Sequence, residues 1–127
     1  MKIPFRHLVS ILTAALVLSA CAVQHTKTAL QPRADSAPAQ PHTLAETQEL
    51  RLNTGYIRQL KAGSQWLHVG RTAEGEVYRP YKDVLTVEGA HIHEAYLVVN
   101  GRKVVGFYLP AEGSFSKLNQ EVAITFR

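Results

Sequence analysis

The sequence is poor in cysteine: Cys21 is the only one among 127 residues. No intramolecular disulfide can form, so the folded part must be stable through its hydrophobic core alone. A free thiol would be a liability for a chain that is exported into an oxidising compartment. This scarcity excludes a disulfide-linked scaffold and makes the fate of Cys21 important.

Long hydrophobic runs are also absent. The longest apolar stretch, Leu8 to Leu18, has eleven residues and is interrupted by Ser10 and Thr13. A helix that crosses the hydrocarbon core of a bilayer needs about 20 residues. A short apolar stretch behind the basic residues Lys2 and Arg6 is instead typical of a secretory signal peptide.

The leader ends with Leu18-Ser19-Ala20-Cys21. This segment resembles the lipobox of bacterial lipoproteins, and the resemblance covers only the leader. It implies that a signal peptidase removes residues 1–20, and that Cys21 carries a diacylglycerol on its sulfur and an acyl chain, such as palmitate, on its amino group. Three chains hold a protein on a membrane stably, whereas one chain binds reversibly.

The residue after the cysteine is Ala22 rather than aspartate. In the enterobacterial sorting pattern this implies delivery to the outer membrane, with a lipid-anchored domain in the periplasm. Two alternatives stay open, namely an ordinary secreted protein cleaved near Ala20 and an uncleaved membrane anchor.

Clustered charge is missing as well. The formal net charge of +4 falls to +2 without Lys2 and Arg6, and residues 44–127 hold ten Lys and Arg against nine Asp and Glu. No basic run is longer than Arg102-Lys103. Nucleic-acid binding needs a clustered basic patch, so nucleic acid is excluded as a partner.

The residue sets of common catalytic sites do not occur. There is no phosphate-binding loop, no dinucleotide fingerprint and no nucleophile elbow. Serines that could pair with His68 or His93 are present, but Asp83 is the only aspartate in residues 44–127. These serines are Ser64, Ser114 and Ser116. A lipidated Cys21 is no nucleophile. We therefore expect no enzymatic activity and no cofactor.

Three histidines are the only candidates for a metal site. His91 and His93 point the same way in a strand, and with His68 they would supply the three ligands of a zinc site. Because spacing of two is a weak signal, solvent-facing or hydrogen-bonded histidines are favoured. No metal is expected.

Residues 21–43 contain Pro32, Pro38 and Pro41, many Ala and Gln, and almost no large apolar side chain. Such a segment cannot bury enough surface to offset its ordering entropy. We expect a lipidated cysteine followed by a flexible tether with a coil reach of about 25 Å.

Residues 44–127 are expected to form the folded domain, which is small and mainly β. Thr43 and Glu46 match a capping box, which predicts a helical turn or two from Leu44 and extended chain from about Gly55. The alternative is a pair of short strands at 48–52 and 56–60.

The rest of the domain carries strand signals every eight to twelve residues, at 65–70, 75–78, 84–87, 92–99, 102–109 and 120–126. This spacing predicts a mainly-β fold, a small antiparallel sandwich or partly open barrel of about six to seven short strands. The expected core residues are Trp66, Val69, Val77, Leu85, Val87, Tyr96, Val98, Val105, Phe107, Leu109, Val122, Ile124 and Phe126.

The strongest local signal is Asn100-Gly101 between two apolar runs, which predicts a β-hairpin from Ile92 to Pro110 with a two-residue loop. This loop would place Val99 opposite Arg102, Leu97 opposite Val104, Ala95 opposite Gly106 and His93 opposite Tyr108. The small Gly106 would leave space for another backbone or ring. Both hairpin faces are mostly apolar, so both must be covered, by the same chain or by a partner.

Tyr78-Arg79-Pro80-Tyr81 places two rings and a guanidinium around a proline. Tyr and Arg are enriched where proteins bind one another. Tyr78, Arg79 and Tyr81, with Tyr108 of the hairpin, are the candidate interaction residues, and tyrosines that only cap the open end of a barrel are the simpler alternative.

These features together predict an outer-membrane lipoprotein whose domain is a structural or interaction module. An accessory subunit of an envelope machine for secretion or conjugation has a similar layout, and its partner would be an envelope protein. The alternative is a periplasmic binding protein, or an inhibitor of a host enzyme such as lysozyme.

Overall fold

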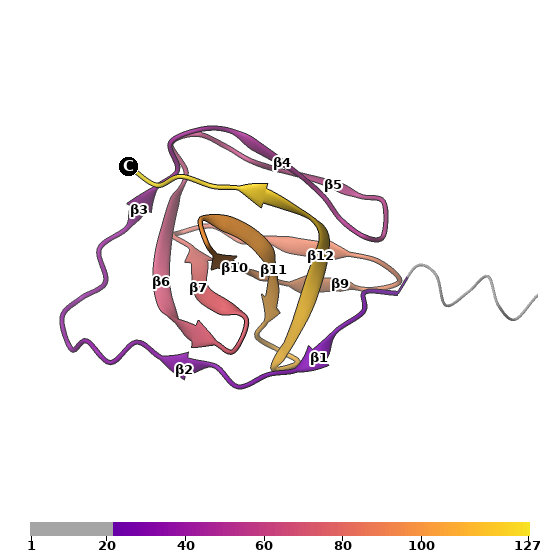
Figure 1. Ribbon diagram of the computed structural model, residues 1–127, viewed down its shortest axis with the longest axis horizontal. Helices are drawn as coiled ribbons and strands as arrows, with labels where there is room; N and C mark the ends of the chain where they lie inside the picture. The colour runs from indigo at the N-terminus through magenta and orange to yellow at the C-terminus, as the bar shows by residue number, and fades with distance from the viewer. Residues whose placement is uncertain (1–21) are drawn as a thin grey trace, which may run out of the picture.

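The computed structural model describes residues 22–127, so the expected signal peptide at residues 1–20 and the expected lipidation site Cys21 lie outside the described residues (Figure 1). The described chain contains twelve strands. They are β1 (Thr26–Lys27), β2 (Gln31–Pro32), β3 (His42–Thr43), β4 (Gln48–Arg51), β5 (Ile57–Leu60), β6 (Gln65–Thr72), β7 (Gly75–Pro80), β8 (Thr86–Glu88), β9 (Ile92–Glu94), β10 (Tyr96–Asn100), β11 (Lys103–Leu109) and β12 (Ser114–Ala123). Within residues 22–127, no helix is long and apolar enough to cross a bilayer.

The main sheet is antiparallel and follows the order β1-β12-β11-β10-β7-β6-β2, with β3 also paired to β6. It curves into a half-barrel, which Figure 1 shows around β7, β10 and β11. The predicted mainly-β class, a small sandwich or partly open barrel, is confirmed.

Residues 42–45 connect β6 with the segment that follows β12. His42 lies opposite Trp66 of β6, while the amides of Ala45 and Arg127 donate to the carbonyls of Thr125 and Thr43, both at 2.8 Å. Leu44, at the centre of this crossing, is fully buried. The segment is therefore a strand-like bridge, and its pairing brings residue 42 next to the C-terminal residues.

Two hairpins, β4–β5 and β8–β9, cover the face of the sheet that bears Leu97 and Phe107. Leu50 and Leu60 of the first hairpin and Val87 of the second complete the main core. The helical turn expected from Leu44 is wrong, because burial of alternate residues in these short strands outweighs the local capping signal. The alternative of two short strands is correct.

The opposite face of the sheet has a second, smaller core. Val77, Val98 and Tyr108 are buried there, and Leu30 packs against them. Leu30 lies between β1 and β2, which pair with β12 and β6. This packing differs from the flexible tether expected for residues 21–43, and the folded domain begins well before residue 44. The composition of this segment suggested coil. It is ordered because single apolar residues pack on the core and its backbone pairs with the edges of other strands.

The expected hairpin exists as β10 and β11, but it begins at Tyr96 rather than Ile92, because Ile92–Glu94 pair with β8. Tyr96 rather than His93 therefore lies opposite Tyr108, and the register near the turn also differs from the prediction. Asn100 lies opposite Lys103, Val99 opposite Val104 and Leu97 opposite Phe107. The positive φ angles fall at Gly101 (59°) and Arg102 (62°), so the turn is one residue later than expected. The strand pairing is also irregular next to Val105, which has no partner between Val104 and Gly106. The turn residues Asn100 and Gly101 cannot predict this irregularity, because the irregularity depends on how the strands pack in the folded domain.

Most of the expected core residues are buried. Val69, Tyr96, Val105, Val122 and Phe126 are only half-buried. The sequence interpretation missed several fully buried leucines, notably Leu44, Leu50, Leu97 and Leu118. Their burial depends on the hairpin register and on the two covering hairpins.

Candidate interaction surface

The four candidate interaction residues do not share one surface. Tyr108 is only 8 % exposed and packs in the second core. Tyr78 packs on the other face of the sheet, against the main core. Arg79 is exposed, and Tyr81 is half-buried with Nζ of Lys82 5.2 Å from its ring centre. Tyr108 therefore does not belong to an accessible site with Tyr78.

Tyr78 is the centre of an aromatic group that comes from four segments. Its ring centre lies 5.0 Å from that of Phe126, 5.2 Å from that of His68 and 5.6 Å from that of His42. We call these four residues the Tyr78 cluster. Phe126 and His42 are also neighbours, at 5.5 Å. Aromatic pairs at these separations contribute about 0.5–1.5 kcal/mol beyond their buried area.

The sequence interpretation did not associate His42 or Phe126 with Tyr78. His42 was placed in a tether and Phe126 in the core. The bridge formed by residues 42–45 is what brings these two rings to β7. The only sequence pattern related to this arrangement is the alternation of Val122, Ile124 and Phe126. This pattern predicts that Phe126 faces the main core, but it does not predict contact with Tyr78.

Glu76 borders the Tyr78 cluster and is held between two basic side chains. Its carboxylate lies 2.7 Å from Nε2 of His68 and accepts a 3.1 Å hydrogen bond from Nε of Arg71. The hydrogen bond from Arg71, helped by His68, lowers the pKa of Glu76 although partial burial opposes the shift. Glu76 is therefore a stable anion rather than a proton donor.

Tyr78 itself is kept neutral. Burial raises the pKa of its hydroxyl, and the nearby charge of Glu76 adds to this shift. Its phenol thus remains a neutral hydrogen-bonding group beside a paired carboxylate.

A shallow hollow of about 480 Å³ adjoins the cluster. Tyr78 and Phe126 form its apolar side, while Glu76 and Arg102 supply charges of opposite sign. Half-buried rings with a charged border are typical of protein recognition surfaces. Chemically, this arrangement can accept apolar or aromatic side chains of a partner and pair with charges around them.

The histidines considered for a metal site have other partners. His68 contacts Glu76, and Nδ1 of His93 lies 2.6 Å from Oε1 of Glu112. Among residues 22–127, no three His, Cys, Asp or Glu side chains are grouped so that they could hold a metal ion. These two histidines instead hydrogen-bond to carboxylates.

Two of the three candidate serines, Ser64 and Ser114, form hydrogen bonds with groups other than histidine. Ser64 donates to the carbonyl of Lys61 at 2.6 Å and accepts from the indole of Trp66 at 3.0 Å. Ser114 donates to the carbonyl of Glu112 at 3.3 Å. In the part of the chain that the structure describes, none of the hydrogen bonds made by Ser64 or Ser114 reaches a histidine.

A second hollow, of about 260 Å³, lies where the described chain begins. Ala22 and Val23 form one side of it, and the apolar side chains of Leu52, Val87 and Phe107 face it. Its position beside residue 22 separates it from the Tyr78 cluster, because β3 and the C terminus lie at the other end of the molecule (Figure 1).

The chain was compared with known proteins. No protein-family model, no curated protein and no solved structure matches the chain.

Proposed function

We propose that the protein is an outer-membrane lipoprotein, lipidated on Cys21, whose β domain acts as an interaction module in an envelope assembly. The observation that carries this proposal is the leader: a basic head, an apolar stretch of eleven residues and Leu18-Ser19-Ala20-Cys21, with no other cysteine in the chain. The role of accessory subunit in a secretion or conjugation machine is proposed only by analogy, because small lipoproteins of such machines have a similar order of leader and small domain.

The shape of the domain supports this role. Residue 22 lies at one end of the molecule, while β3 and the C terminus, which carry His42 and Phe126 of the Tyr78 cluster, lie at the other (Figure 1). A lipid on Cys21 would hold the first end at the membrane. The Tyr78 cluster would then face away from the membrane, where a partner can reach it.

The chemistry of the cluster favours a protein partner. Its rings are half-buried or exposed, its hollow is shallow, and its carboxylate Glu76 already contacts Arg71 and His68. Small-molecule sites are usually deeper and bury most of their ligand. Flat aromatic surfaces with a polar rim are typical of protein interfaces.

Labelling with radioactive palmitate tests the lipid anchor. The wild-type protein should incorporate label and fractionate with the outer membrane, whereas Cys21→Ala should do neither. Label-free wild-type protein in the soluble periplasmic fraction would contradict the proposal.

Site-specific photo-cross-linking in living cells tests the interaction surface. A photoreactive phenylalanine analogue at Phe126 should capture a defined envelope protein, and the same analogue at Gln120, exposed on β12, is the matched control. Equal adducts at both positions would contradict a specific surface. Capture of a soluble host enzyme instead would favour the inhibitor alternative.

A further inference from the structure

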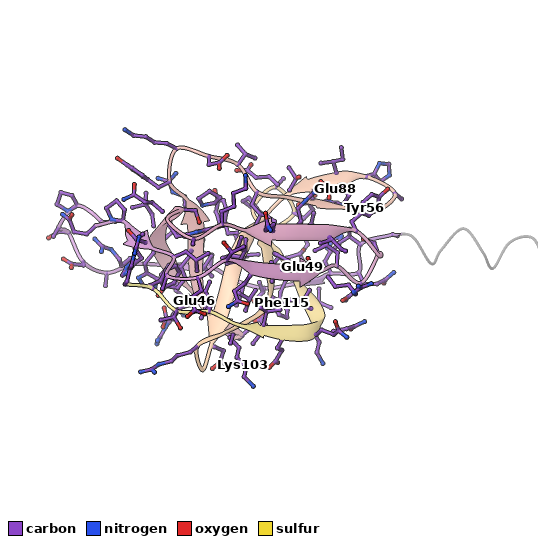
Figure 2. The ribbon with its side chains drawn as sticks, turned by 90° about the horizontal axis from the view of Figure 1, so that it is seen from above. Glu46, Glu49, Tyr56, Glu88, Lys103 and Phe115 are labelled. Atoms are coloured by element: carbon purple, nitrogen blue, oxygen red, sulfur yellow. The ribbon has the colours of Figure 1, made fainter. Side chains whose placement is uncertain are left out.

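The end of the molecule at residue 22 exposes large apolar side chains. Ile92 is 73 % exposed, Tyr56 is 52 % and Ile57 is 45 %. We call these three residues the apolar end. They belong to two different hairpins, since Tyr56 and Ile57 follow the β4–β5 turn and Ile92 follows the β8–β9 turn. Figure 2 shows Tyr56 beside Glu88, close to the point where the described chain begins.

The two hairpin turns are tied together, so these side chains are held as a unit. The hydroxyl of Thr54 donates to the carbonyl of Glu88 at 2.5 Å. Arg58 donates to the carbonyl of Thr86 at 3.1 Å and forms an ion pair with Glu88. The pair compensates the charge of Glu88, which lies opposite Ile92 in the β8–β9 register.

The start of the chain is packed against the same place. Ala22, Val23 and Gln24 border one hollow with Asn53 and Thr54 of the β4–β5 turn. Val23 packs against the main core, and Thr26 is paired with Phe115 of β12. There is consequently no slack between residue 22 and the domain, and Cys21 directly precedes Ala22 in the sequence.

We infer that the apolar end rests in the headgroup region of a phospholipid bilayer. This inference rests on the proposed lipidation of Cys21, because acyl chains at that position bring the membrane to this end of the domain. Tyr is favoured at the membrane–water interface, and isoleucine side chains gain free energy by leaving water there. The domain is then held against the membrane by this end rather than moving on a long tether.

A fluorescent probe at each position tests the contact in the full lipidated protein. Because a lipidated Cys21 has no free thiol, Tyr56→Cys and Ile92→Cys each supply a single labelling site for an environment-sensitive dye. Val84→Cys is the matched control: Val84 is 66 % exposed and lies before β8, at the other end of that strand from Glu88. All three side chains are exposed, so the substitutions should leave the fold intact.

The labelled proteins are reconstituted into vesicles of phosphatidylethanolamine and phosphatidylglycerol that contain nitroxide-labelled lipid. Probes at residues 56 and 92 should be quenched several-fold more than the probe at residue 84. Equal quenching at the three positions would overturn the inference. The mass of the same samples separates the two proposals, since lipidated protein with unquenched probes refutes only the membrane contact, and unlipidated protein refutes the proposed function with it.

Discussion

The ring of Phe115 covers Gly106. The two residues lie on neighbouring strands, β12 and β11, and Figure 2 shows Phe115 on the sheet. A Cβ at residue 106 would stand 2.6 Å from Cε2 of Phe115 and 2.4 Å from the carbonyl oxygen of Ser116. The expectation that this glycine admits a ring is confirmed, although Val98 rather than Ala95 lies opposite it.

Gly106→Ala should therefore destabilise the protein. The added methyl group meets a backbone carbonyl that cannot move without disturbing the β11–β12 pairing, so we expect the free energy of unfolding to fall by about 1–3 kcal/mol. Urea unfolding measures this change. Glu121→Ala, exposed on β12, is the control, and an unchanged stability of Gly106→Ala would contradict the close packing.

The turn position predicts opposite effects of two neighbouring glycine substitutions. Arg102 has a φ of 62°, in the left-handed region that costs an L-residue about 1–2 kcal/mol. Arg102→Gly should raise the free energy of unfolding by about 1 kcal/mol. Asn100→Gly should lower it, because Asn100 is a strand residue that donates to the carbonyl of Glu74 at 3.1 Å. The reverse order in thermal unfolding would instead favour a turn centred on Asn100-Gly101.

Packing of the segment before residue 44 is tested at Leu30. Leu30→Ser removes an apolar side chain from the second core, and we expect the free energy of unfolding to fall by about 1 kcal/mol, since full burial of Leu contributes about 1.5–3 kcal/mol. Ala29→Ser, at an exposed neighbouring residue, should have no effect. If the segment were a free tether, both variants would match the wild type in chemical denaturation.

Acid should destabilise the protein through carboxylates whose pKa is lowered in the folded state, among them Glu112 and Glu76. The hydrogen bond from His93 lowers the pKa of Glu112, and that from Arg71 lowers the pKa of Glu76. A lowered folded-state pKa adds stability above the unfolded value, about 4.3 for Glu, and this stability is lost as pH falls through the folded pKa. Stability should therefore decline below about pH 4. Glu112→Gln and Glu76→Gln should each flatten this decline, and a slope equal to that of the wild type would contradict the assignment.

Predictability differed between the strands and the candidate site. The strands at Trp66, Val77 and Phe107 were predictable because alternation and turn residues are local patterns. The Tyr78 cluster was predictable only in part. Tyr78 was a candidate because Arg79, Pro80 and Tyr81 follow it in the sequence. His42 and Phe126, in contrast, join it through pairing between segments about eighty positions apart.

The amino-acid sequence by itself determined the mainly-β class and the existence of the central hairpin, since each depends on neighbouring residues. The tertiary structure decided the hairpin register, the docking of residues 22–43 and the grouping of Tyr56, Ile57 and Ile92 at one end. Those features depend on which strand edges and core faces come together from distant parts of the chain. No local segment of the sequence contains that information.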